Sequence, residues 1–246
     1  MLRIMEQSKE AAVVKMGRLT RQQIEEILNA QGSKLNLAGE DLSELDLSHL
    51  DLSGANLAGA NLRQANLSDT QLRDINLSQA NLERASLSNA NLSGANLGGA
   101  NLSGANLNDT YLLKATLVQA NLSTTNLAKA KLDEANLTEA NLQQVNLDRA
   151  YLVRTNLSQA NLSEANLAGA NLKNATLDGA NLARAILTEV FMESASLNGT
   201  NLLQAKLKGA TLAKASYDNQ TQWDADFDPA AAGAVAKKKK WLGLFG

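Results

Sequence analysis

The sequence is short of the residues that most proteins use for cross-links, turns and bulky cores. It contains no cysteine, one proline and one histidine in 246 residues, and aromatic residues make up only 3% of it. Without cysteine there is no disulfide, no thiolate metal site and no cysteine nucleophile. The core must therefore be filled by aliphatic side chains, and an apolar content of 44% is sufficient for one.

Long apolar runs are missing as well. The first 18 residues, MLRIMEQSKEAAVVKMGR, mix acidic with basic residues and hold no apolar run of signal-peptide length. Nowhere do 18 apolar residues stand together, as a membrane-spanning helix would require. We therefore expect a soluble, cytoplasmic protein, and the lack of cysteine fits a reducing compartment.

What the sequence has instead is a five-residue repeat. From Leu35 to Lys214 it divides into 36 units without a slip in register, starting with LNLAG and ending with ATLAK. Position three is leucine in 35 of the 36 units, Met192 being the exception, and position one is alanine in 24. Positions two, four and five are mostly polar, small or charged.

This pattern predicts a stack of coils. Positions one and three point to the same side of an extended segment. Because five is odd, the next unit would turn its apolar pair outward unless positions four and five form a corner. Glycine, serine, asparagine and aspartate crowd the corner positions, as is typical of turns. A single coil cannot bury its own leucines, so coils must stack, and the predicted fold is an all-β solenoid.

The units also resemble a known family. ANLSG, ANLAG and ANLTE match the A-(D/N)-L-x-x signature of pentapeptide-repeat proteins, without a gap over residues 35–214. This resemblance implies that four units form a square coil of 20 residues and that the coils wind into a right-handed quadrilateral β-helix. About nine coils follow, stacked over about 43 Å. A similar sequence after the repeat occurs in cyanobacterial members, so we expect a member of that type.

An open solenoid exposes apolar side chains and unpaired backbone groups at both ends, so we expect caps. The predicted segments are an N-terminal segment at 1–34 with a capping helix at about 20–30, the β-helix at 35–214, a C-terminal cap at 215–236 and a tail at 237–246. At the C-terminal end the bulk that could cover the last coil comes from Tyr217, Trp223 and Phe227.

The expected helix carries start and stop signals. Thr20 and Gln23 have the spacing of a capping box, and Leu19 and Ile24 that of a hydrophobic staple. Gly32 is a suitable stop. The helix face that would cover the first coil consists of Ile24, Ile27 and Leu28.

Catalytic patterns are absent from the sequence. The single histidine, His49, falls on an exposed corner beside Asp46 and Asp51, where a surface histidine has most often no catalytic role. The serines and aspartates have no histidine or lysine base placed beside them by any recognisable motif. The glycine pairs recur at five-residue spacing and lack the Lys-Ser/Thr ending of a phosphate loop. We predict no enzyme, no cofactor and no metal site.

Three non-enzymatic functions are considered. The first, which we favour, is a rigid scaffold that binds a protein partner. The second follows from the resemblance, since some pentapeptide-repeat proteins mimic duplex DNA and act on DNA gyrase. The third is a membrane-associated assembly or docking factor that uses its tail.

Charge argues against mimicry of DNA. Residues 35–214 contain 17 acidic and 13 basic residues, which leaves four negative charges. Duplex DNA carries one negative charge per about 1.7 Å, so a rod of about 43 Å would need about 25. The acidic residues gather only in the first coil, and we expect no nucleic acid as a partner.

The tail KKKKWLGLFG combines a basic run with an apolar end. Its candidate docking residues are Lys237, Lys238, Lys239, Lys240, Trp241, Leu242, Leu244 and Phe245. Lysines attract anionic lipid, and aromatic residues favour the membrane interface. Three interpretations stay open, namely a flexible solvated tail, a peptide that docks on a protein, and a weak membrane contact.

One face of the solenoid carries the candidate interaction residues. With a 20-residue coil, units that begin at 50, 70, 90 and onward share a face, and their outward position two includes Tyr111, Tyr151 and Phe191. The other residues of the candidate interaction face are Leu113, Lys131 and Val153. Aromatic side chains interspersed with basic ones are typical of binding hot spots. We predict a surface for a protein partner or a second copy, against the alternative that solitary apolar residues lie there by chance.

Overall fold

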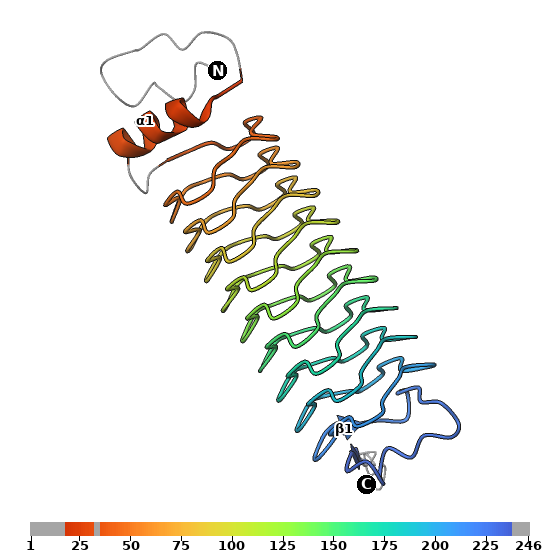
Figure 1. Cartoon of the computed structure of the whole chain (residues 1–246). Helices are drawn as coiled ribbons and strands as arrows, with labels where there is room; N and C mark the ends of the chain where they lie inside the picture. Colours follow the sequence, from red (N-terminus) through yellow and green to blue (C-terminus); the bar gives the residue numbers. More distant parts are fainter. Residues whose placement is uncertain (1–17, 32–34, 238–246) are drawn as a thin grey trace, which may run out of the picture.

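The repeats wind into a straight rod. The computed structural model describes residues 18–31 and 35–237. Figure 1 shows the coils stacked along one axis, with a helix across the N-terminal end and an irregular segment at the C-terminal end.

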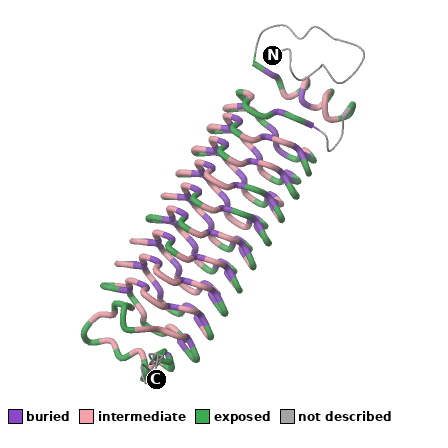
Figure 2. Tube along the Cα trace, turned by 180° about the vertical axis from the view of Figure 1, so that it is seen from behind, coloured by how far each residue is buried: buried purple, intermediate pink, exposed green. Residues whose placement is uncertain are grey.

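Each coil pairs with the next through parallel bridges at a constant spacing. The position-two residue of a unit bridges the residue 20 positions later, from Asn36 with Asn56 to Ser196 with Ser216. Four units therefore complete one coil. Positions one and three point inward, so that Ala95 and Leu97, for example, are fully buried. Figure 2 shows buried segments recurring from coil to coil along the rod, between intermediate and exposed ones.

The corners have an unusual backbone conformation. The N–H of position one donates to the carbonyl of the preceding position three, as in Ala100 to Leu97 at 3.0 Å. All 36 residues at position five have positive φ, and 26 of them are not glycine. Residues other than glycine rarely adopt this conformation, so tertiary pairing imposes it here.

The rod has four faces, which we number by their position-two residues. The first face begins at Asn36, the second at Asp41, the third at Asp46 and the fourth at Asp51. On the second face the side chains form an asparagine ladder, in which each Nδ2 donates to the Oδ1 of the residue 20 positions earlier. Its eight links, 2.9–3.5 Å long, join Asp41, Asn61, Asn81, Asn101, Asn121, Asn141, Asn161, Asn181 and Asn201.

Aspartate takes position two only where no coil precedes it. An interior asparagine must donate to the rung before it and accept from the rung after it. Asp41, Asp46 and Asp51 stand in the first coil and need only accept, as Asp41 does from Asn61 at 2.9 Å. A carboxylate has acceptors and no donor, so it fits the first rung and not an interior one.

Helix α1 (Arg21–Gln31) lies across the first coil. The N–H of Thr20 donates to Gln23 Oε1 at 2.9 Å and the N–H of Gln23 to Thr20 Oγ1 at 3.3 Å, which is the reciprocal pair of a capping box. Leu19 and Ile24 are buried in the same core cluster as the leucines of the coils. Gly32, the predicted stop, lies outside the described residues.

At the other end the parallel backbone bridges continue past Lys214. Strand β1 (Ser216–Tyr217) pairs in parallel with β2 (Val235–Ala236). On the second face Asn201 bridges Gln222, a spacing of 21 residues rather than 20. One extra residue before Gln222 therefore shifts the five-residue pattern out of register. The ring centroids of Trp223 lie 5.8 Å from Tyr217 and 5.1 Å from Phe227, and all three rings pack against the core.

Candidate functional site

The fourth face departs from the polar pattern of the others. Among the described residues, its position-two side chains form only one hydrogen bond from coil to coil, from Asn91 to Gln71 at 3.3 Å. From position 111 onward large side chains stand where the other faces mostly carry asparagine, and the bridges stack them in the order Tyr111, Lys131, Tyr151, Asn171, Phe191. We call Tyr111, Leu113, Lys131, Tyr151 and Phe191 the aromatic stripe.

The apolar members of the stripe are the largest group of exposed apolar side chains in the described residues. Tyr111 is 43% exposed, Tyr151 48% and Phe191 46%. Two coils separate each ring from the next, a distance of about 9.6 Å. The Nζ of Lys131 lies 4.0 Å from the ring centroid of Tyr111, a cation–π contact that fixes the lysine between the tyrosines.

A row of alternating charges runs beside the stripe. Glu134 lies 3.7 Å from the Nζ of Lys114 and 3.3 Å from Arg154, which belong to the coils before and after it. All three sit at position five of the fourth face and are largely exposed. Such pairs contribute little stability but give the rim of the stripe a fixed pattern of charge.

Two residues at position four show how far the predicted surface extends. Leu113 is 43% exposed, beside Tyr111, as the register predicts. Val153 is only half-exposed, and its N–H donates to Asp133 Oδ1 at 2.9 Å. Leu203, on the second face, is 40% exposed and was not among the predicted residues, although its position four also predicts an outward side chain.

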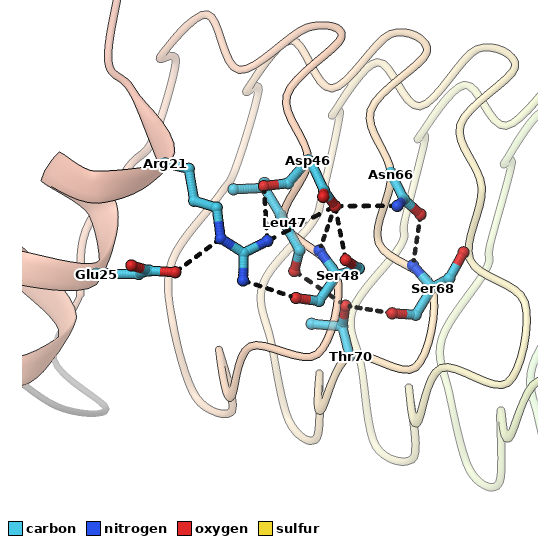
Figure 3. A network of polar contacts seen from close by, with 8 residues as sticks. All are labelled: Arg21, Glu25, Asp46, Leu47, Ser48, Asn66, Ser68 and Thr70. Atoms are coloured by element: carbon cyan, nitrogen blue, oxygen red, sulfur yellow. Dashed lines mark hydrogen bonds and ion pairs between the residues drawn. The ribbon is translucent and has the colours of Figure 1, made fainter.

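The acidic residues of the first coil are engaged with the helix and with serines. Asp46 accepts from the hydroxyl of Ser48 at 2.6 Å and from Asn66 at 2.9 Å, and it lies 3.6 Å from Arg21 (Figure 3). The Ser48 hydroxyl and then its N–H hold the pKa of Asp46 below its ordinary value. The pKa of Asp41 is lowered in the same way, by the hydroxyl and the N–H of Ser43. This acidic cluster is therefore among the contacts that hold the N-terminal segment on the first coil, which we call the N-terminal anchor.

Arg21 has a further role in that anchor. Its guanidinium donates to the backbone carbonyls of Asp46 at 3.0 Å and Ser48 at 3.1 Å. One coil later the equivalent carbonyls, those of Asn66 and Ser68, accept from backbone N–H groups of the first coil. Arg21 thus supplies the two donors that a preceding coil would have supplied (Figure 3).

The other features considered from the sequence are the single histidine, metal ligands, membrane-spanning helices and the C-terminal tail. His49 is exposed at a corner, and within residues 18–31 and 35–237 no three histidine or acidic side chains come together as metal ligands would. In the same part of the chain no helix has the length and apolar character to cross a bilayer. Of the tail, Lys237 is exposed, and residues 238–246 lie outside the described residues.

The repeat has counterparts in other proteins. The sequence profile described as "Pentapeptide repeats" matches eight copies, within residues 41–79, 70–109, 105–144, 140–179 and 175–213. HetL, a pentapeptide repeat protein involved in heterocyst differentiation regulation from the cyanobacterium Nostoc sp. strain PCC 7120, is 31% identical over 83% of this chain and 95% of its own, with a TM-score of 0.39.

Two further solved structures resemble the chain. The pentapeptide repeat protein alr5209 from Nostoc PCC 7120 is 40% identical over 44% of this chain and 84% of its own, with a TM-score of 0.35. QnrB1, a plasmid-mediated fluoroquinolone resistance protein, is 16% identical over 73% of this chain and 92% of its own, with a TM-score of 0.41. Comparison with curated proteins gives no match.

Proposed function

This chain belongs to the pentapeptide repeat family, whose members fold as right-handed quadrilateral β-helices, and from that premise we propose that it is a non-enzymatic scaffold. In this proposal a rigid rod of about nine coils, capped by α1, presents the aromatic stripe to a protein partner.

The observation that carries the proposal is that the fourth face lacks the asparagine ladder of the second face and carries the aromatic stripe at the same repeat position. On the second face the ladder is continuous, and each interior asparagine adds side-chain hydrogen bonds worth about 1 kcal/mol each. The fourth face gives up these bonds at 111, 151 and 191 for side chains that remain 43–48% exposed. Such local departures from a stabilising pattern are typical of functional sites.

The composition of the stripe favours a protein as the partner. Tyrosine and arginine are enriched in hot spots, and Arg154 lies beside the stripe. A surface with so few net charges offers little to nucleic acid. The acidic residues of the first coil, which could have imitated phosphates, are partly neutralised by Arg18 and Arg21.

The test is the triple variant Tyr111→Ser, Tyr151→Ser, Phe191→Ser. We expect its β-type circular dichroism and melting temperature to stay close to those of the unchanged chain, while a partner recovered from the native cell, or self-association in sedimentation, is lost. The matched control is Ile186→Ser with Leu203→Ser, which removes outward apolar side chains from the third and second faces. Equal recovery with the triple variant and the unchanged chain would refute the proposal.

A further inference from the structure

The last coil can be checked for unpaired donors, because every interior coil follows the same rule. The N–H groups of positions three and five donate to the coil that follows. On the third face, Leu187 donates to the carbonyl of Lys206 at 3.0 Å and Glu189 to that of Lys208 at 3.0 Å. A last coil therefore has two such donors on each face that need replacement acceptors.

The C-terminal segment supplies these acceptors on two faces. On the first face Leu197 donates to the carbonyl of Ser216 at 2.8 Å and Gly199 to the carboxylate of Asp218 at 2.9 Å. The second face is closed in the same way, by bonds from Leu202 to the Gln222 carbonyl and from Gln204 to Asp224 Oδ1. On the fourth face Lys214 donates to the carbonyl of Gly233, while the N–H of Leu212 has no acceptor among the described residues.

The third face is left open. Neither the N–H of Leu207 nor that of Gly209 has an acceptor among the described residues, and the carbonyl of Ala205 has no donor there. Leu207 and Ala205 are only partly buried, whereas their counterparts in earlier coils are fully buried. We call the backbone at 205–209 the open edge.

A hollow of about 310 Å³ adjoins the open edge. Its lining consists of the apolar residues Leu202, Ala205, Leu207 and Phe227 and the charged residues Lys208, Asp224 and Asp226. A cavity of about 150 Å³ is already large enough to bind benzene, so this hollow has room for a leucine side chain or two. The open edge thus has unpaired donors and adjoins an apolar hollow lined by one lysine and two aspartates.

We propose that the open edge is occupied by the chain's own tail, with Leu242, Gly243 and Leu244 adding one more repeat unit. Leu-Gly-Leu reproduces positions one to three, as Leu45-Asp46-Leu47 does in the first coil. In the interior pattern the N–H groups of Leu207 and Gly209 would donate to Gly243 and Phe245 carbonyls. The side chain of Leu244 would fill the hollow above Leu207.

The point where the described chain stops allows this placement. The N–H of Lys237 donates to the Tyr217 carbonyl at 2.7 Å, at the end of the first face. Opposite sheets lie about 10 Å apart. The five residues from Lys237 to Leu242 can span about 17 Å, so the tail can reach the third face. Lys238, Lys239 and Lys240 would then pass the carboxylates of Asp224 and Asp226.

This inference does not depend on the aromatic stripe, and amide exchange in the full chain tests it. We expect Leu242→Asp with Leu244→Asp to speed exchange at Leu207 and Gly209 at least tenfold, with Leu187 and Glu189 unchanged. The matched control, Trp241→Asp with Phe245→Asp, adds the same charge at positions that would point outward, and it should leave exchange unaltered. Equal effects of the two variants, or none, would overturn the proposal.

A disulfide test in this cysteine-free chain identifies the occupant. Position-two residues of adjacent coils are close enough to be cross-linked, so Lys206→Cys with Gly243→Cys should form an intrachain disulfide. The control Thr211→Cys with Gly243→Cys, on the fourth face, should react at least tenfold more slowly. Equal rates would indicate an undocked tail, and a disulfide-linked dimer a second copy; either would overturn the proposal. So would tail-dependent sedimentation with phosphatidylserine vesicles if exchange at Leu207 did not depend on the tail.

Discussion

At the scale of the residue, position five carries the largest conformational cost in the repeat. Left-handed backbone costs an L-residue about 1–2 kcal/mol, and glycine avoids this penalty at a smaller entropic cost. Lys129, with φ of 58°, has no ion pair among the described residues, so its replacement by glycine removes the backbone penalty without breaking an ion pair.

We therefore predict that Lys129→Gly stabilises the protein by about 1 kcal/mol. The reverse change, Gly104→Ala, should destabilise it by a similar amount, because Gly104 has φ of 65° and an added Cβ would meet only ordinary contacts, at 3.5 Å or more. Denaturant unfolding measures both. Opposite signs are required, and a Lys129→Gly variant less stable than the unchanged chain would contradict this account of the corners.

The aspartates at position two of the first coil should make the stability of the protein depend on pH. Serine hydroxyls and N–H groups lower the pKa of Asp41, Asp46 and Asp51 in the folded state from the ordinary value of 3.8. A lowered pKa stabilises the fold above the unfolded value, and that stabilisation is lost as the pH falls through the folded pKa.

Melting temperature should therefore stay level from pH 7 to about 5 and fall below about pH 4. The triple variant Asp41→Asn, Asp46→Asn, Asp51→Asn should show a shallower fall, because asparagine keeps the acceptor without the titrating charge. Asp69→Asn, at an exposed corner of the third face and without a side-chain hydrogen bond among the described residues, is the control. An unchanged acid limb in the triple variant would contradict the assignment.

At the scale of the element, α1 is attached to the first coil by its apolar face and by Arg21, whose guanidinium replaces the donors of a preceding coil. Arg21 satisfies two carbonyls of the first coil, which no apolar contact of the helix could do. Hydrogen bonds from a charged donor contribute more than neutral ones, although Arg21 is 36% exposed and the gain is reduced accordingly.

Arg21→Ala should lower stability by about 1–2 kcal/mol, and Arg21→Lys should recover at most half, since one ammonium cannot place two donors as the guanidinium does. Amide exchange should rise at Leu47 and His49 and stay unchanged at Leu147, in the middle of the rod. Gln22→Ala, on the exposed side of α1, is the control. An Arg21→Ala variant with unaltered exchange in the first coil would show that the helix is held by its apolar face alone.

At the scale of the whole molecule, most of the fold could be predicted because a single rule generates it. An apolar pair at positions one and three, repeated every five residues, can be buried only if the chain turns after each unit. The same register, together with the 20-residue coil implied by the family resemblance, predicted that Tyr111, Tyr151 and Phe191 share one face and point outward, and all three are exposed.

The ends could not be predicted in the same way, because they depend on single contacts rather than on the repeat. Arg21 reaches carbonyls 25 and 27 residues away, with no periodic signal. The extra residue before Thr221 hides the bridge between Asn201 and Gln222 from a search for five-residue units. The open edge at Leu207 and Gly209 is visible only once the bonds of the last coil are counted.

The central claim is that the fourth face exchanges stability for binding, and restoring asparagine there tests the stability side. Asparagine at 111 and 191 would stand next to Asn91 and Asn171 and could accept from the N–H two residues on. Tyr111→Asn, Tyr151→Asn, Phe191→Asn together should raise the free energy of unfolding by about 1–2 kcal/mol.

The measurement that tests the claim most directly is quantitative capture of partners from the native cell by this asparagine triple variant beside the unchanged chain. Loss of a hot-spot residue costs about 2 kcal/mol of binding free energy. We therefore predict that the triple variant is more stable than the unchanged chain but no longer captures the partner. Capture of the same proteins in the same amounts by both, or no capture and no self-association by the unchanged chain, would contradict the account.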